Sequence, residues 1–329
     1  MHWTKENSPY YIVGNVEVKG NSNLVIDPGV EVRFDGNYSI SVDSSSMISA
    51  NGTYSEPILF TASDNVSSWD GITLENTYLN YDKQNGKPIY RKGNRFSNVK
   101  FEKYSNGISG TAFMENVVIS SKDIALSSFT GVLNDSEVSL GSININSGSI
   151  ITNTKFVYNK AATINGSTIV DSSFNSYSIL SNCNVFNSTG TMTIEGASSV
   201  VNGGTFTGNK IELDGSVSNI TYENTAGNVT VLGTLKSSEI KTSVLKSTGS
   251  IYDSTLDVSG RATISGKANG IKATVEILDV NGLEVHNSNF TANSTSTMTD
   301  VNQSHNTYTI GSALTMTDVN QSHNTYTIG

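Results

Sequence analysis

Cysteine, proline and charged residues are all scarce in this sequence, and each scarcity excludes a class of protein. The 329 residues include one cysteine, Cys183, four prolines and only 15% charged side chains. A single cysteine excludes an internal disulfide framework, so packing and hydrogen bonds must stabilise the chain. No segment approaches the ~18 apolar residues of a membrane-spanning helix, and strong helix formers are too few for long helices.

The charge balance and the abundant residues narrow the choice further. The formal net charge is −9 and no basic stripe is present, which argues against a nucleic-acid partner because phosphates require clustered Lys and Arg. Serine, threonine, asparagine and 29 glycines are abundant. Apolar residues make up 36% of the chain and recur at regular intervals, unlike in disordered segments. With many residues that favour strands, the composition predicts an all-β fold.

A short pattern recurs along the chain: Asn or Asp, a small residue, any residue, and a large apolar residue. Its apolar positions mostly lie 16–19 residues apart, and the wider step before the last one indicates a missed copy near residues 270–277. Steps of 11 and 21 residues around Val185 sum to two ordinary steps. The copies, two of them looser, end at Phe101, Ile119, Val138, Phe156, Phe174, Val185, Phe206, Tyr222, Ile240, Leu256 and Phe290.

A second set of apolar positions follows the first along the chain, and each lies in a short strand that glycine ends. Examples are Ile164, Ile194, Leu213, Val231 and Ile264. The chain also contains an identical copy of one segment: Thr297–Gly311 recurs at Thr315–Gly329, eighteen residues later. The duplication therefore has the same spacing as the repeat. We interpret it as one added turn of a solenoid, in which each turn contacts only its neighbours.

These spacings predict a right-handed parallel β-helix with turns of about 16–19 residues, because crossovers between parallel strands are right-handed in ~98% of cases. A left-handed hexapeptide helix would need apolar residues every six positions, whereas Ile169, Phe174 and Ile179 step by five. We expect one domain over residues 1–329. Residues 1–75 form its N-terminal turns, 76–96 an inserted loop, and 97–329 regular short turns with the last one duplicated.

The Asn and Asp column suits the corner of each turn, because these side chains bond nearby backbone and tolerate left-handed conformations. Stacked amides can also bond from turn to turn. A calcium ladder is the alternative, but Asn outnumbers Asp in the column. Small residues are expected to point inward beside the corner, at Ser136, Thr154, Ser172, Cys183 and Ser254. A buried small residue is the plain interpretation of Cys183, since no base for a nucleophile is evident.

The N-terminal segment resembles a known family. Residues 3–34, "WTKENSPYYIVGNVEVKGNSNLVIDPGVEVRF", followed by "SSMISANGTYSEPILFTAS" and "SSWDGITLEN", are similar to the opening of right-handed parallel β-helix repeat proteins, the pectate-lyase-like modules of bacterial and archaeal surface proteins. The resemblance implies a turn at Pro28–Gly29 and core positions for Trp69 and Ile72. It also implies secretion and display at the cell surface. The superfamily includes enzymes, adhesins and structural proteins, so the fold alone gives no activity.

One insertion interrupts the repeat and combines aromatic with basic residues, which can stack on sugar rings or bind acidic glycans. A hairpin or loop that merely shields the core is the alternative. The candidate glycan-binding residues are Tyr78, Tyr81, Lys83, Lys87, Tyr90, Arg91, Lys92 and Arg95.

Other chemistry has weaker support. The catalytic carboxylate sets of sugar-cleaving β-helices are not evident, and we expect no cofactor and no metal. His305 and His323, stacked eighteen residues apart, would supply only two metal ligands. Thr-x-Thr steps resemble ice-binding surfaces but stack regularly over only two turns. The opening "MHWTKENSPYY" lacks the apolar segment of a signal peptide, which fits a cytosolic protein or a mature segment with an added Met.

Together these observations predict a non-catalytic extracellular or cell-surface scaffold: a surface-layer, sheath, filament or adhesin module. Its expected partners are further copies of itself, in a homo-oligomer or filament, and a cell-surface polysaccharide. No transmembrane segment is expected. The alternative is a carbohydrate-active enzyme, a polysaccharide lyase or glycoside hydrolase, or a glycan-binding module.

Overall fold

The computed structural model describes residues 1–157, 160, 162–282 and 284–329. Strands account for 64% of the residues and helix for 1%. The strands stack in parallel as a β-solenoid of about 18 turns, consistent with a right-handed parallel β-helix. The predicted fold class is therefore confirmed. The chain divides into two compact units, Met1–Ser178 and Ile179–Gly329, and the single expected domain stays a prediction.

The turns contribute strands, or parts of longer strands, to three faces, here called the first, second and third face. In residues 1–178, a 3-10 helix (Lys5–Asn7) lies between the first two strands. The first face holds β1 (His2–Trp3), β4 (Asn23–Ile26), β7 (Met47–Asn51), β17 (Ile150–Thr152) and β20 (Thr168–Val170). The second holds β2 (Tyr10–Ile12), β5 (Glu31–Phe34), β8 (Ile58–Ala62), β15 (Glu137–Ser139) and β18 (Lys155–Val157). The third holds β3 (Val16–Val18), β6 (Ser39–Val42), β9 (Gly71–Leu74), β16 (Ser142–Ile145) and β19 (Ala162–Asn165). Longer strands continue round corners: β12 (Arg95–Glu102), β13 (Ile108–Ser120), β14 (Ile124–Asn134) and β21 (Ser173–Ser181).

Residues 179–329 repeat the arrangement. The first face holds β22 (Asn184–Phe186), β24 (Val200–Asn202), β27 (Ser216–Ser218), β29 (Thr234–Lys236), β31 (Ser250–Tyr252), β33 (Lys267–Asn269), β35 (Glu284–His286), β38 (Asn302–Ser304) and β41 (Asn320–Ser322). The second holds β25 (Thr205–Phe206), β36 (Asn289–Ala292), β39 (Thr307–Ile310) and β42 (Thr325–Ile328), and the third β26 (Lys210–Leu213), β37 (Ser296–Thr299) and β40 (Leu314–Thr317). Five longer strands continue from the second face to the third: β23 (Thr189–Glu195), β28 (Thr221–Val231), β30 (Glu239–Ser247), β32 (Thr255–Ile264) and β34 (Lys272–Val280).

The core consists of inward side chains stacked in register, because alternate residues of a strand point to opposite faces. On the second face, Phe156 pairs with Phe174 and their rings stack 4.7 Å apart. Phe290 pairs with Tyr308 in the same way, at 5.2 Å. These side chains are at most 2% exposed. The predicted inward column is confirmed, and its missing member near residue 270 is Ala273, which pairs with Leu256 and Phe290.

The Asn and Asp column occupies the corner before the second face, as predicted. Its members adopt positive φ, for example 51° at Asn98 and Asn116 and 48° at Asp135. Asparagine and aspartate reach this left-handed region at lower cost than other side chains. Their side chains also bond from turn to turn: the Asn116 amide donates to the Asn98 carbonyl oxygen, and the Asn153 amide donates to Asp135 at 2.5 Å.

The inward small residues after the corner accept a backbone hydrogen bond from the preceding turn. The Val117 N–H donates to Ser136 Oγ at 3.1 Å, and the Ser238 N–H donates to Ser254 Oγ at 3.2 Å. A left-handed corner turns this N–H away from the regular ladder, and a buried donor without a partner would be costly. The hydroxyl of the next turn therefore completes the hydrogen bonding of each corner.

Val185 and Cys183 lie in other columns than the sequence predicted. Val185 belongs to the first face and pairs with Val201. The second-face position of that turn is Gly190, which pairs with Phe206. Because glycine interrupts the apolar pattern of the second face in this turn, the sequence pattern assigned Val185 of the neighbouring first-face strand to the column. Cys183 precedes a first-face strand, and its carbonyl oxygen accepts a hydrogen bond from the Val200 N–H; it is fully buried, as expected.

The N-terminal turns follow the expectation from the family resemblance. Pro28 and Gly29 form the turn between β4 and β5, with Gly29 at φ 75°. Trp69 is fully buried and stacks on Phe34 with ring centroids 4.2 Å apart. Its indole N–H donates to the Glu102 carbonyl oxygen at 2.8 Å. Ile72 is also buried.

Candidate functional site

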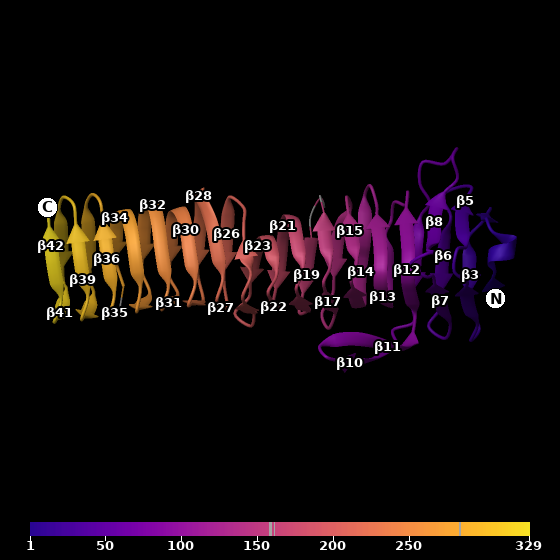
Figure 1. Cartoon of the computed structure of the whole chain (residues 1–329), viewed down its shortest axis with the longest axis horizontal. Coiled ribbons are helices and arrows are strands. Elements are labelled where there is room, and N and C mark those ends of the chain that lie inside the picture. Colours follow the sequence, from indigo (N-terminus) through magenta and orange to yellow (C-terminus); the bar gives the residue numbers. More distant parts are fainter. Residues whose placement is uncertain (158–159, 161, 283) are drawn as a thin grey trace. The chain divides into compact units, whose positions relative to one another are not determined.

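The insertion folds as an antiparallel hairpin of β10 (Leu79–Gln84) and β11 (Lys87–Gly93), which lies outside the stacked turns (Figure 1). The two residues between the strands, Asn85 and Gly86, have φ of 52° and 82°. Such a pair of positive φ values is typical of the Asn-Gly turns that match the twist of two-residue hairpins. The predicted loop of residues 76–96 is thus a hairpin, and Arg95 and Phe96 belong to β12.

The hairpin packs on an apolar patch on the outside of the first face. Phe113, Val132 and Ile150 form this patch on three successive turns and are at most 7% exposed. The partly buried side chains of Leu79, Tyr81 and Tyr90 cover it. On the following turn the equivalent position is Thr168. Burial of outward apolar residues therefore holds the hairpin in place.

Several candidate glycan-binding residues already have partners within the hairpin. Arg91 forms an ion pair with Asp82 at 2.5 Å, and Lys92 lies 5.6 Å above the ring of Tyr78. In the part of the chain that the structure describes, Lys83 and Lys87 make no ion pair. These two lysines are therefore the cations of the hairpin that remain available to an external ligand.

Arg95 and Tyr90 join the hairpin to the wall of the solenoid. The Arg95 guanidinium lies 4.9 Å from the centre of the Tyr90 ring and 3.7 Å from the Glu115 carboxylate. Tyr90 also packs edge-on against Phe113 and donates its hydroxyl to the Gly93 carbonyl oxygen at 2.8 Å. Burial raises the pKa of Tyr90 above its ordinary value. Both residues fix the position of the hairpin, which leaves little of either for a ligand.

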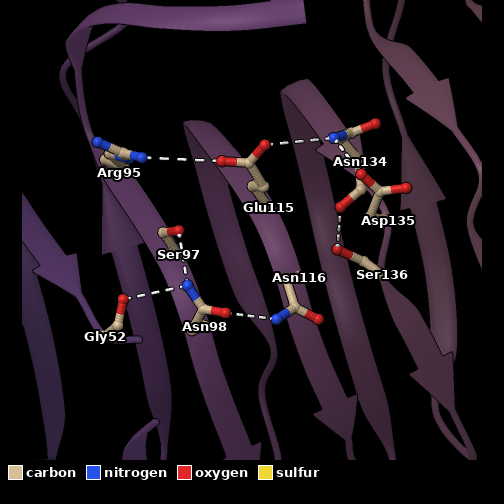
Figure 2. Close-up of polar contacts among 9 residues, drawn as sticks. All are labelled: Gly52, Arg95, Ser97, Asn98, Glu115, Asn116, Asn134, Asp135 and Ser136. Atoms are coloured by element: carbon tan, nitrogen blue, oxygen red, sulfur yellow. Dashed lines mark hydrogen bonds and ion pairs between the residues drawn. The ribbon is translucent and has the colours of Figure 1, made fainter. Parts of the chain in front are cut away.

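A groove lies beside the hairpin tip, and Figure 2 shows three of its residues, Glu115, Asn134 and Asp135. It has a volume of about 400 Å³, and its floor is formed by Glu115, Asn134 and Asp135. The Asn134 amide donates to Asp135 at 2.9 Å and to Glu115 at 3.4 Å. The tip residues that complete the groove are Gln84, Asn85, Lys87, Pro88 and Ile89. Amide, carboxylate and ammonium groups along an open groove suit the hydroxyls of a saccharide.

The C-terminal histidines occupy the corner column. His305 and His323 have φ of 57° and 54°, at the positions that Asn or Asp fill in earlier turns. Their rings stack 4.9 Å apart. His286 lies on the first face, where its Nδ1 is 2.8 Å from Ser304 Oγ. Among the described residues, no group of three or more His, Cys, Asp or Glu side chains could hold a metal ion.

The 314–328 turn, made of β40, β41 and β42, has an exposed edge. Met316 and Ile328 are 42% and 52% exposed, whereas their identical counterparts Met298 and Ile310 are at most 1% exposed. The N-terminal turn differs, because its Trp3 is only 7% exposed and stacks on Tyr10 at 5.1 Å. The 314–328 turn thus presents apolar residues that the identical turn before it buries.

No protein-family model matches the chain, and no similar protein was found among curated proteins or among solved structures. Across the described residues, no helix is long and apolar enough to cross a membrane. The attribution to pectate-lyase-like surface modules therefore stays a prediction from the N-terminal resemblance.

Proposed function

We propose that this chain is a non-catalytic structural or adhesive scaffold of the cell surface, whose stacked turns associate end to end with a further copy. The stacking of parallel turns in one register, including two identical turns, is the observation that carries the proposal. Met316 and Ile328 present the same surface that Met298 and Ile310 bury under an identical turn. An exposed parallel edge with unpaired backbone groups is a template for further strands.

The regular architecture supports a mechanical role. Within each compact unit, neighbouring turns pair along their faces, and corner amides, hydroxyls and aromatic rings repeat the connection in the same register. In such an array, the interface between neighbouring turns is the unit of stability. Extracellular placement follows from the resemblance to surface modules and completes the proposal.

The mass of the chain in solution tests end-to-end association. We expect the wild-type chain to form larger species as its concentration rises, in analytical ultracentrifugation or light scattering. A variant with Met316→Lys and Ile328→Lys should stay monomeric, because two charges would be buried in the contact. A matched control with two lysines on exposed sites away from the edge, Ser44→Lys and Thr225→Lys, should associate like wild type. Monomers for all three proteins would refute association.

Incubation with pectin, alginate and other uronic-acid polymers tests the non-catalytic part. We expect neither new reducing ends nor unsaturated products. If either product forms, and still forms with a variant that lacks the 314–328 turn, the chain is a carbohydrate-active enzyme instead.

A glycan-binding module is the second candidate, and the groove at the hairpin tip favours it. We expect Lys83→Ser with Lys87→Ser to abolish binding on an array of acidic glycans, because among the described residues these are the hairpin cations with neither an ion pair nor a contact over an aromatic ring. A control that removes two other exposed lysines, Lys210→Ser with Lys236→Ser, changes the net charge equally. Equal binding by both variants would exclude the groove as the site.

A further inference from the structure

A groove follows the corner between the first and second faces on the outer surface of the first compact unit. Two adjoining hollows of about 260 and 380 Å³ form it, and they share Asn116 and Val118. We call it the corner groove. It meets the groove beside the hairpin tip at Asp135, but its lining comes from the turns and from the loop between β7 and β8.

The first hollow has an apolar lining that includes an exposed aromatic ring. Tyr54 lies in the loop between β7 and β8 and is 94% exposed. The Glu56 N–H donates to Thr53 Oγ1 at 3.0 Å, and the Thr53 N–H donates to the Glu56 carbonyl oxygen at 3.1 Å, which closes the loop. Pro57 and Val118 line the same hollow. A tyrosine ring beside apolar side chains can stack on the flat face of a ligand ring.

The corner column forms the floor of the groove, and its asparagines donate to the turn before them. The Asn98 amide donates to the Gly52 carbonyl oxygen at 3.1 Å, and the Asn116 amide donates to Asn98 Oδ1 (Figure 2). The Asn153 amide donates to Asp135 Oδ1 at 2.5 Å. The amide nitrogens of the floor are therefore already engaged within the column.

The column is interrupted between Asn116 and Asp135. A carboxylate has no N–H, so Asp135 cannot donate to Asn116 in the way that Asn153 donates to Asp135. Among the described residues, no group donates to Asn116 Oδ1 (Figure 2). Glu137 lines the same hollow and makes no ion pair in the described part of the chain. The second hollow thus contains an amide oxygen and two carboxylates that can accept further hydrogen bonds.

The charges that line the corner groove balance. Asp135 and Glu137 are matched by Lys100 and Lys155, and neither lysine forms an ion pair with a described residue. A balanced groove has no excess positive charge to hold a polyanion, and its carboxylates repel those of a uronic acid. Hydroxyl groups fit this lining, because they donate to carboxylate and amide oxygens and accept from ammonium groups.

We propose that the corner groove binds a neutral polysaccharide, which stacks a sugar ring on Tyr54 and donates hydroxyl hydrogen bonds to Asn116 and Asp135. The apolar hollow fits the flat C–H face of a pyranose, and the second hollow fits its hydroxyls. The hollows follow one another across stacked turns ~4.8 Å apart, so one linear chain can occupy both.

An extended peptide fits the groove less well, because its backbone would bring carbonyl oxygens to a floor whose amide nitrogens are engaged. The polysaccharide site goes beyond the proposed scaffold function. It requires neither end-to-end association nor the lysines of the hairpin.

Isothermal titration calorimetry with soluble polymers tests the class of ligand. The neutral probes are a β-glucan, a mannan and a galactan, polygalacturonate is the acidic probe, and unfolded casein is the polypeptide probe. We expect at least one neutral polysaccharide to bind the wild-type chain, with an affinity that changes little between low and high salt, because no ion pair forms. Binding of polygalacturonate or casein without binding of any neutral polysaccharide would overturn the proposal.

Two variants with matched controls locate the site. Tyr54→Ala should weaken binding about tenfold, because the sugar ring loses its stacking partner. Tyr177→Ala removes another exposed tyrosine of the same compact unit, outside the groove, and should bind like wild type. Asp135→Asn should also weaken binding, because the added amide can donate to Asn116 in place of the ligand. Asp253→Asn is its control, since φ is 47° at Asp253 and 48° at Asp135 and the charge changes equally.

Thermal melting by circular dichroism shows whether each variant is folded, so that a loss of binding is not mistaken for unfolding. Weaker binding by both groove variants, with wild-type binding by both controls, would support the corner groove. Wild-type binding by folded Tyr54→Ala and Asp135→Asn, or an equal loss in the controls, would overturn it. None of these outcomes bears on end-to-end association, which the mass measurement tests.

Discussion

Gly249→Ala should destabilise the chain strongly, although it adds a single methyl group. Gly249 lies at the corner between β30 and β31, and its φ is not in the left-handed region. Alanine could therefore adopt the same backbone conformation, and any loss of stability must come from contacts. A Cβ at this position would lie less than 3.0 Å from the carbonyl oxygens of both Gly233 and Leu232.

The structure sets the scale of the effect. The methyl carbon would also be 2.7 Å from the Leu232 carbonyl carbon, whereas ordinary contact begins at 3.4 Å. All three clashing atoms belong to the backbone, so no side chain can rotate away. Gly233 stands one turn earlier, and Gly266 one turn later meets Gly249 in the same way. Overpacking typically lowers the free energy of unfolding by about 1–3 kcal/mol. Because the turns can relieve this clash only by separating, we expect a loss of about 3 kcal/mol for Gly249→Ala.

Urea denaturation and thermal melting followed by circular dichroism measure this loss. For a domain of 150–250 residues, about 3 kcal/mol corresponds to a fall of roughly 6–12 °C in Tm. Gly14→Ala is the matched control, because a Cβ there has no atom within 4 Å and its φ is also outside the left-handed region. If Gly249→Ala melted like Gly14→Ala, close backbone packing at this corner would not limit the spacing of the turns.

Three further predictions concern the core, the hairpin and acid stability. Phe174→Ala should cost about 3–5 kcal/mol in urea unfolding, because it leaves a cavity beside Phe156; a wild-type midpoint would refute the assigned register. Phe113→Ser should release the hairpin and speed proteolysis at Lys87 while the turns stay folded; unchanged cleavage would mean that the apolar patch does not hold it. The Gly20 N–H holds the pKa of Asp43 at about 2, below the ordinary 3.8. The stability from this carboxylate is present above about pH 4 and lost as the pH falls toward 2. Asp43→Asn should flatten that part of the stability profile, and an unchanged profile would contradict the assignment.

The roles of the hairpin residues depend on how the hairpin packs against the first face of the solenoid. From the sequence, its tyrosines and basic residues form one set of eight candidates. In the structure, Tyr90 and Arg95 fasten the hairpin, and Arg91 is paired with Asp82. The signal that would have revealed this packing is the run of Phe113, Val132 and Ile150 at outward positions where other turns carry polar residues. Among the described residues, Lys83 and Lys87 are the hairpin cations with neither an ion pair nor a ring contact, and their role in glycan binding stays a prediction.

The spacing of the apolar residues determined the fold class. A step of 16–19 residues is too short for a turn to bury its own core, so stacking was the one arrangement that could bury Phe156 under Phe174. The corner column was equally readable, because a left-handed corner favours Asn and Asp, and Asn98, Asn116 and Asp135 all adopt positive φ. Both features were predictable because they repeat: each turn must bury apolar side chains against its neighbours and form a corner.

The tertiary structure decided what repetition could not. The step at Val185 was misassigned because Gly190 occupies the second face without an apolar side chain, and only strand pairing shows which residue faces the core. The contacts of Arg95 and the hydrogen bonds of Gln303 with Tyr308 and Tyr326 join residues that the sequence places in separate strands. Both depend on side-chain directions and distances between neighbouring turns. A periodic sequence sets the pitch of a solenoid, but hydrogen bonds form between atoms that only the stacked turns bring together.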